Sequence, residues 1–436
     1  MSSGLPDFEV DEQVLGKQLF DCITDLFPIC RSITGDGVRE TLARLARVVP
    51  LTTHEVPSGT PVFDWTVPDE WNIRDAYVKN ARGERVIDFR RSNLHVVNYS
   101  VPFRGRMSLE ELRPHLFTLP EQPDRVPYRT SYYQRNWGFC LSQNQLDALA
   151  EGEYEVCIDS SLQPGCLTYG ELTIPGCSTE EVLVSAHICH PSLANDNLSG
   201  AVIAAHAARR LQSLSLRLSY RFLFIPATIG SIAWLSANEA RVPGIRYGLV
   251  LACLGDPGPL TYKRSRRSDA KIDQAAIHVL QQLGEHEVLE FSPYGYDERQ
   301  FCSPGFDLPV GRLSRTPHGR FPEYHTSADN LAFIQPAQLA KSLSACLEIF
   351  EVIERDRTCL NRKPNCEPQL SKYGLYDPIG GVAESPEFRM AILWVLNLSD
   401  GRHSLLDIAE RSGLRFRQIA LAADALSEHG LLENVQ

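Results

Sequence analysis

Residues 181–200 read EVLVSAHICHPSLANDNLSG, and this stretch decides the fold class. Its first six residues form a short apolar run, typical of a buried strand, which ends at His187. A polar loop follows, and then the spacing of alanine and aliphatic residues predicts a helix from Ser199 to Leu211. A buried strand, a polar loop and a helix in this order indicate one unit of an α/β fold.

The same alternation continues along the chain. Apolar runs at 220–226 and 247–253 predict two more strands, and helices are expected from Ser231, over 272–283 and over 331–350. Strands that alternate with helices imply an α/β protein with a doubly wound, mainly parallel sheet. Ligands of such a sheet gather at the carboxyl ends of its strands, so the loop after His187 becomes a candidate site.

Changes in composition along the chain suggest its domain organisation. Aromatic residues, prolines and short alternating runs replace the helical pattern in the second segment, and the segment before the C-terminal module is rich in proline, glycine and charge. We predict five parts: 1–54, a helical part of the α/β domain; 55–142, an inserted β-rich domain; 143–360, the α/β domain; 361–384, a linker; 385–436, a winged-helix-like module with Gly401 and Gly413 at its turns. The insertion is expected to shape the mouth of the site through Trp65, Trp71 and Trp137.

Composition excludes several classes of protein. The 436 residues are 43% hydrophobic and 22% charged, which is ordinary for a chain with a sizeable core and rules out global disorder. The net charge of −11 makes nucleic acid a poor partner, and the C-terminal module is itself more acidic than basic. We find no signal peptide and no membrane segment, and the 12 cysteines form no Cys-x-x-Cys pair, so we expect a cytoplasmic protein with reduced thiols.

Four polar clusters follow strands or lie in loops of the α/β unit. They are 187–197, with two histidines and an Asp; 319–330, with His325 among acids and hydroxyls; 294–299, a charged knot; and the turn at Asp256. Imidazole and carboxylate groups are the ligands of catalytic zinc sites. Taken alone, the first cluster is more simply explained by turn and helix-capping residues, but the His325 cluster shifts the balance towards a metal site.

These motifs resemble a known superfamily, the zinc-dependent aminopeptidases. More closely, the chain is similar to a family of bacterial aminopeptidase-like proteins that have an inserted β domain and a C-terminal winged helix. The matching phrases are FDWTVP (63–68), YQRNWGFC (133–140), HICHP (187–191) and EYHTS (323–327). The resemblance covers nearly the whole chain and implies a fold of zinc-exopeptidase type.

The resemblance also implies a metal site. His187, Asp196 and His325 match the metal-ligand positions, and Asp256 is a looser match to the Asp of a second metal. The acid pair that the superfamily carries after the second strand is incomplete in the closer family, which implies one zinc ion. We therefore expect about one zinc per chain, with an open coordination position for water.

One departure from the family's pattern concerns the general base. The closer family reads Pro-Glu-Thr-Ile-Gly-Ser where this chain has Pro226 to Ser231 with Ala227 in place of the glutamate. A neighbouring acid such as Glu298 or Glu323 takes over, or the site binds without turnover, or Ala227 is an introduced, inactivating substitution. If the base is missing, Ala227→Glu should raise hydrolysis by about 10²-fold.

The leading hypothesis is a zinc-dependent hydrolase of a peptide or other amide bond, acting on a small peptide or aminoacyl-type substrate. Asp297, Glu298 and Glu323 are candidates to contact a substrate amine, and Tyr294, Tyr296, Arg299 and Tyr324 are expected to line the pocket. The alternative is a non-catalytic binding or regulatory protein on this scaffold, whose C-terminal module contacts protein, as in a homo-oligomer. A cysteine hydrolase using Cys189 with His190 is disfavoured, because adjacent residues on a turn rarely align for catalysis.

Overall fold

The computed structural model describes residues 11–375 and 386–435. Residues 11–270 and 286–344 form one compact unit, and 271–285 together with 345–375 and 386–435 form a second. We describe the units as the α/β unit and the C-terminal unit. In the described part of the chain, no helix has both the length and the apolar character needed to cross a membrane.

An eight-stranded sheet forms the centre of the α/β unit. Its order is β1 (Thr52–Pro57), β10 (Cys166–Ile174), β12 (Ser219–Ile225), β11 (Glu181–His187), β13 (Ile245–Leu251), β16 (Val310–Ser314), β14 (Leu260–Lys263) and β15 (His286–Leu289). The four central strands, β12-β11-β13-β16, are parallel, and antiparallel pairs flank them on both sides. The predicted α/β class with a mainly parallel sheet is confirmed.

Strand β11 is buried on both faces, which explains why its sequence is a continuous apolar run. Val182, Leu183, Val184 and Ala186 are fully buried, and the strand ends at His187, whose side chain is also buried. Parallel strands covered on both faces have no solvent side, so they need no polar alternation. Consequently His187 lies at the carboxyl end of a buried central strand of the sheet.

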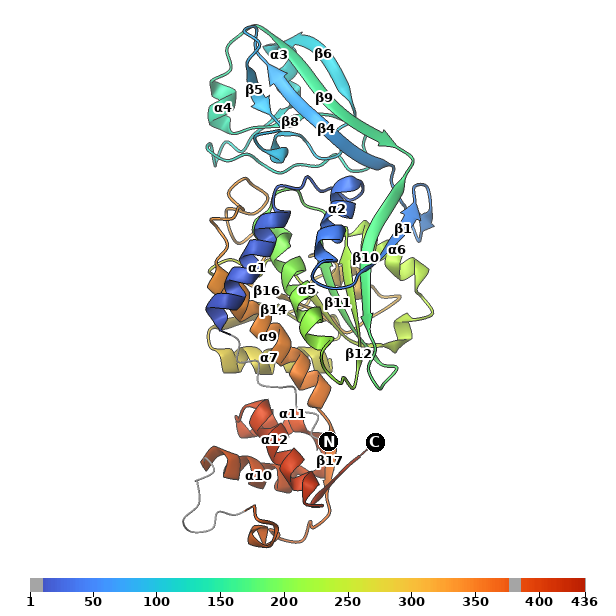
Figure 1. Ribbon diagram of the computed structural model, residues 1–436, viewed down its shortest axis with the longest axis vertical. Coiled ribbons are helices and arrows are strands. Elements are labelled where there is room, and N and C mark those ends of the chain that lie inside the picture. Colours follow the sequence, from blue (N-terminus) through green and yellow to red (C-terminus); the bar gives the residue numbers. More distant parts are fainter. Residues whose placement is uncertain (1–10, 376–385, 436) are drawn as a thin grey trace. The chain divides into compact units, whose positions relative to one another are not determined.

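Helices cover the sheet. α1 (Glu12–Leu26) packs on α5 (Gly200–Leu211), and both cross the same side of the sheet in Figure 1. A side chain at Gly200 would collide with the carbonyl oxygen of Leu251, so glycine lets α5 begin against the end of β13. The other helices are α2 (Asp36–Leu45), α6 (Ile229–Ala237), α8 (Glu298–Phe301) and α9 (Pro336–Arg355).

Helix α9 begins at Pro336 rather than at residue 331, where the sequence pattern placed its start. Proline lacks a backbone N–H and is favoured in the first turn of a helix, where that group has no partner. The five residues before it stay in turn conformations. They continue the loop that carries His325.

A second sheet is inserted after β1. It has the order β5 (Arg85–Asp88), β4 (Glu70–Lys79), β9 (Glu153–Gln163) and β6 (Phe103–Ser108), and all its pairs are antiparallel. Figure 1 shows β9 running on into β10, so one extended segment of chain joins the two sheets. Small pairs complete the insertion: β2 (Pro61–Val62) with β3 (Trp65–Thr66), and β7 (Leu116–Phe117) with β8 (Phe139–Cys140); short helices α3 (Leu109–Leu112) and α4 (Gln143–Asp147) lie between the strands.

The C-terminal unit has the architecture of a winged helix. Its elements are β17 (Thr358–Asn361), α10 (Pro386–Leu398), β18 (Asp400–Ser404), α11 (Leu405–Ser412), α12 (Phe416–Glu428) and β19 (Leu432–Asn434). Ser404 and Asp407 cap the start of α11, and Gly413 ends it with a left-handed residue. Helix α7 (Lys271–Leu283), expected from the sequence at 272–283, packs in this unit, where His278 accepts a hydrogen bond from the backbone N–H of Phe416. Of the segment predicted as a linker, 361–384, residues 376–384 lie outside the described residues, and the described part contains a short 3-10 helix at Leu370–Tyr373.

Candidate metal and active site

The side chain of Asp196 is the centre of a histidine cluster. Its two carboxylate oxygens each meet an imidazole: Oδ1 lies 2.9 Å from His187 Nε2, and Oδ2 lies 3.1 Å from His325 Nε2. His190 is the third member, since one ligand atom from each of His187, His190 and Asp196 lies within 4.8 Å of the others. His187 and Asp196 are completely buried.

Three different elements hold this cluster in place. His187 ends β11, Asp196 lies in the irregular turn Ala194–Ser199 before α5, and His325 lies in the loop between β16 and α9. Asp329, in the same loop as His325, accepts hydrogen bonds from the backbone N–H groups of Asn195 and Asp196 at 2.6 and 2.9 Å. The loop that carries His325 is therefore tied directly to the turn that carries Asp196.

Asn197 orients the ring of His187. Its Oδ1 accepts from the backbone N–H groups of Gly200 and Cys253, so its Nδ2 must face Leu251 O at 2.9 Å and His187 Nδ1 at 3.2 Å. With Nδ1 accepting, the proton of a neutral His187 sits on Nε2 and is donated to Asp196. Metal binding at Nε2 would displace that proton, so it should be accompanied by proton release.

The charges in the cluster suit a cation. Burial alone would raise the pKa of Asp196, but His190, His187 and His325 together hold it well below its usual value. Burial lowers the pKa of His190 to about 3, which leaves its ring neutral. A buried carboxylate among imidazoles is the donor set that zinc takes in catalytic sites. The distances from the Asp196 carboxylate oxygens to His187 Nε2 and His325 Nε2, 2.9 and 3.1 Å, are close to the roughly 3.3 Å that separates two ligand atoms on a tetrahedral zinc ion.

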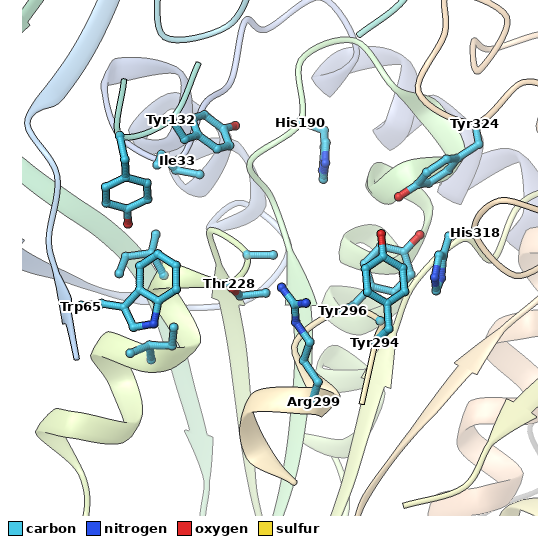
Figure 2. A pocket seen from close by; sticks show the side chains of 15 residues that line it. Ile33, Trp65, Tyr132, His190, Thr228, Tyr294, Tyr296, Arg299, His318 and Tyr324 are labelled. Carbon is cyan, nitrogen blue, oxygen red and sulfur yellow. The ribbon is translucent and has the colours of Figure 1, made fainter. Parts of the chain in front are cut away.

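A pocket of about 330 Å³ lies beside this cluster, and His190 is part of its wall. In Figure 2, His190 and Arg299 reach into the pocket from opposite sides, with Trp65 on one flank and the Tyr294–Tyr296 wall on the other. Aromatic rings also support the ligands from behind: Tyr296 stacks on His187 at 4.9 Å between ring centres, and Tyr324 stacks on His325 at 3.9 Å. Large rings at these positions fix the imidazoles and keep water away from them.

The acids proposed from the sequence have different partners in the structure, and three of them are already paired. Glu298 is completely buried and its Oε1 accepts from Lys263 Nζ at 3.1 Å and Arg312 Nη1 at 3.4 Å. Glu323 lies 3.4 Å from Arg125, and Asp256 is held by Asn195, Thr316 and the backbone N–H of Gly258. None of these three acids lines the pocket, and Asp256 lies outside the group of ligand atoms around Asp196.

Asp297 and Glu298 each have one buried carboxylate oxygen without a partner, but Asp297 differs in that no cation of the described chain pairs with its other oxygen. Its Oδ1 accepts a hydrogen bond of 2.8 Å from Ser231, which belongs to the helix that begins just after Ala227, and its Oδ2 is buried without a partner. Burial raises the pKa of Asp297 to about 6, although the nearby His187 and the Ser231 hydrogen bond both oppose that rise. An acid of this kind can both take and return a proton near neutral pH.

Ala227 lines the pocket, as do three other residues proposed for substrate contact: Tyr294, Arg299 and Tyr324. No carboxylate stands among the described residues of the pocket wall. A side chain at position 227 would thus enter the same space as His190. The methyl group of alanine leaves that space without an acid.

The geometry does not favour a cysteine nucleophile. Cys189 Sγ lies 3.8 Å from His190 Nδ1 and donates to the carbonyl oxygen of Ala227 at 3.7 Å. Burial raises the pKa of the Cys189 thiol, and His190 is held neutral. A catalytic cysteine needs a lowered pKa, so this pair lacks the chemistry of a thiolate site.

Sequence reasoning did not assign His190 and Asp329 their places in the cluster. His190 was interpreted as a turn residue or as the partner of a thiol, and its spacing of three from His187 was the available signal. Asp329 acts through backbone N–H groups of a turn 133 and 134 residues away, and no local pattern encodes such a contact. Asp297 was proposed to contact a substrate amine, whereas the structure gives it a buried oxygen without a partner.

The parallel sheet, with a histidine at the end of β11 and an aspartate before α5, defines an aminopeptidase-like protein on the zinc-exopeptidase scaffold. A family model described as "Domain of unknown function (DUF4910)" matches residues 20–356, and a "winged helix-turn-helix" model matches residues 357–434. The chain belongs to the DUF4910 family. The resemblance to aminopeptidase-like proteins with a C-terminal winged helix is confirmed.

Relatives from Clostridium acetobutylicum span the whole chain. One, named "Putative polysaccharide biosynthesis protein with aminopeptidase-like domain", is 54% identical over 421 residues, which are 96% of this chain and 97% of the relative. A crystal structure of a "putative peptidase" from the same organism is 52% identical, covers 98% of both chains and superposes with a TM-score of 0.93.

More distant structures share the fold. A zinc aminopeptidase from Bacillus subtilis is 13% identical, with a TM-score of 0.56 over 77% of this chain and 94% of its own. A peptidase M28 precursor from Shewanella amazonensis is 12% identical, with a TM-score of 0.53 over 79% of this chain and 96% of its own. At this identity the likeness concerns the scaffold alone.

Proposed function

We propose that the protein is a metal-dependent hydrolase of a peptide or other amide bond. One observation carries the proposal: both oxygens of the buried Asp196 face histidine Nε2 atoms, beside a pocket that can hold a small substrate. His187, Asp196 and His325 would hold the ion, with His190 within reach. Zinc bound there would supply an activated water and would polarise the carbonyl group of the amide.

The protein's own residues prepare this site. Tyr296 and Tyr324 hold the ligand rings by stacking, and Asp329 fixes the turn that carries Asp196. The aromatic wall replaces bulk water around the reacting group, which strengthens every charge interaction inside. Pre-organisation of this kind reduces the rearrangement needed when the bond breaks.

Asp297 is the residue that we assign to proton transfer. Ser231 holds one oxygen, and the other is buried without a partner. Asp297 would accept a proton as the amide is attacked and return it to the leaving nitrogen. It would thus do what Ala227 cannot.

A second candidate is a binding protein that does not turn over its ligand. Ala227 favours it, as does the neutralisation of Glu298 and Glu323 by basic partners. Under this alternative, the metal cluster and the pocket bind a small amide and keep it intact. The two functions differ in one measurable property, which is hydrolysis by the metal-loaded protein.

The test uses zinc-loaded protein and a panel of aminoacyl amides and short peptides. Asp297→Asn should lower hydrolysis by about 10²–10⁴-fold, because it keeps the shape of the side chain and removes the base. In that background, Ala227→Glu should restore about 10²-fold, and the matched Ala227→Gln, which has no carboxylate, should restore nothing. Zinc-loaded protein that binds members of the panel and cleaves none would instead support the binding protein.

A further inference from the structure

The pocket beside the cluster has an unusual lining. Aromatic residues make up much of the lining, and three of them, Trp65, Tyr133 and Tyr294, are at least 48% exposed. The described lining residues include one permanently charged side chain, Arg299, and no acid. An exopeptidase that selects a free amine needs a carboxylate in this wall, and none is present.

Arg299 has no counter-ion in the described part of the chain. It makes no ion pair there, and its Nε is buried without a hydrogen-bond partner. Its guanidinium carbon lies 5.9 Å from the centre of the Tyr294 ring, and Figure 2 shows the group pointing into the pocket towards His190. The rest of the group lines the pocket, so its N–H donors are available to a bound ligand.

Neighbouring residues cannot satisfy it. The carboxylate next in sequence, Glu298, is already shared by Lys263 and Arg312. Asp297, two residues away, has one oxygen held by Ser231 and the other without a hydrogen-bond partner, so it makes no hydrogen bond with Arg299.

We propose that Arg299 binds a carboxylate of the substrate, so that the pocket takes an acidic amide with an aromatic or other flat apolar portion. The carboxylate would form paired hydrogen bonds with the guanidinium, and the aromatic walls would cover the rest of the molecule. The hydrolytic step on this substrate rests on the proposed function, whereas the binding preference does not.

Carboxylate and phosphate both suit a guanidinium, and the pocket distinguishes between them. A phosphate monoester carries nearly two charges and three acceptor oxygens, and proteins bind it with several donors. The described wall offers Arg299 alone as a charged donor. One guanidinium in an aromatic pocket matches one negative charge on a planar group.

Calorimetric titration of the full chain tests this with three probes: N-acetylphenylalanine, its uncharged amide, and phenyl phosphate. We expect the carboxylate to bind at least about 10-fold more tightly than the amide, and more tightly than phenyl phosphate. Arg299→Gln should reduce the preference to less than about twofold, and Arg299→Lys should keep only part of it. Arg74→Gln, in an exposed pair with Asp159, is the control and should leave it unchanged.

Any of the following binding results would overturn the inference. Equal binding of acid and amide, or no binding of the acid, would exclude a carboxylate subsite. A preference that survives Arg299→Gln would place the carboxylate on the histidine cluster, and tighter binding of phenyl phosphate would assign the site to a phosphate. Thermal unfolding of each variant confirms that it is folded. A carboxylate preference without any hydrolysis would leave this inference standing and reject the proposed hydrolase, and hydrolysis without the preference would do the reverse.

Discussion

The site has two parts that differ in this chain: the metal half, which holds the proposed metal ligands, and the acid half, which holds position 227 and the acids that could transfer protons. In the metal half, His187 and His325 each contact Asp196 directly, and stacked rings and backbone hydrogen bonds support them. In the acid half, position 227 holds alanine, and Glu298 is occupied by two cations. A shared scaffold can therefore keep its ligand set while the groups that move protons change.

This difference also separates two kinds of evidence. The metal half can be carried over from a resemblance residue by residue, because each ligand stands in a recognisable phrase. The acid half depends on which carboxylate lacks a partner, which is a property of the folded chain. The predictions below probe each half in turn.

The largest effect should come from removing two ligands of the metal half. A His187→Ala, His325→Ala double variant should lose its metal, falling from about one ion per chain to below about a tenth, because only Asp196 and His190 remain. Elemental analysis of protein purified without added metal measures this. His318→Gln, which changes a histidine of the pocket wall outside the cluster, should retain the ion. Full metal content in the double variant would show that the ion is bound elsewhere.

In the acid half, Glu298→Gln should destabilise the fold by about 3–5 kcal/mol, because it leaves Lys263 and Arg312 as uncompensated buried charges. Urea unfolding gives the value. Asp159→Asn, which breaks an exposed pair with Arg74, should cost less than about 1 kcal/mol and serves as the control. A small effect at Glu298 would mean that its carboxylate is free for chemistry, and the two halves would then be alike.

Asp297→Asn should make the metal-free protein more stable at neutral pH, by up to about 3 kcal/mol. Burial raises the pKa of Asp297 from 3.8 to about 6, so its ionised form is penalised in the folded state above pH 6. That penalty fades as the pH falls from 6 to below 4, where both folded and unfolded states hold the proton. Unfolding of both proteins at pH 7.5 and pH 4 measures the difference. A gain that is equal at both pH values would contradict the raised pKa.

Much of this architecture could be predicted from the sequence. The apolar run at β11 and the alanine stripe of α5 predict the strand and the helix found there, because elements buried in this way carry a continuous apolar pattern. The start of α9 was available from Pro336, which is favoured in the first turn of a helix, whereas the membership of α7 in the C-terminal unit depends on contacts with distant residues. At the site, the sequence proposed His187, Asp196 and His325 as ligands, and the structure brings both histidines against Asp196, whereas the state of each acid follows from partners such as Lys263, Arg312 and Arg125.

The smallest effect is expected at Glu323, the acid that stands next to the Tyr324–His325 stack. Its carboxylate meets Arg125 at 3.4 Å near the surface, a type of pair that contributes less than about 1 kcal/mol. Its backbone carbonyl, however, accepts from the N–H and the hydroxyl of Thr326 and so shapes the turn that carries His325. Glu323→Gln changes only the carboxylate, so hydrolysis should vary by less than about threefold and metal content should not change. A rate loss of about 10²-fold with the metal retained would instead place Glu323 among the groups that move protons, and Asp297 would lose its claim to that role.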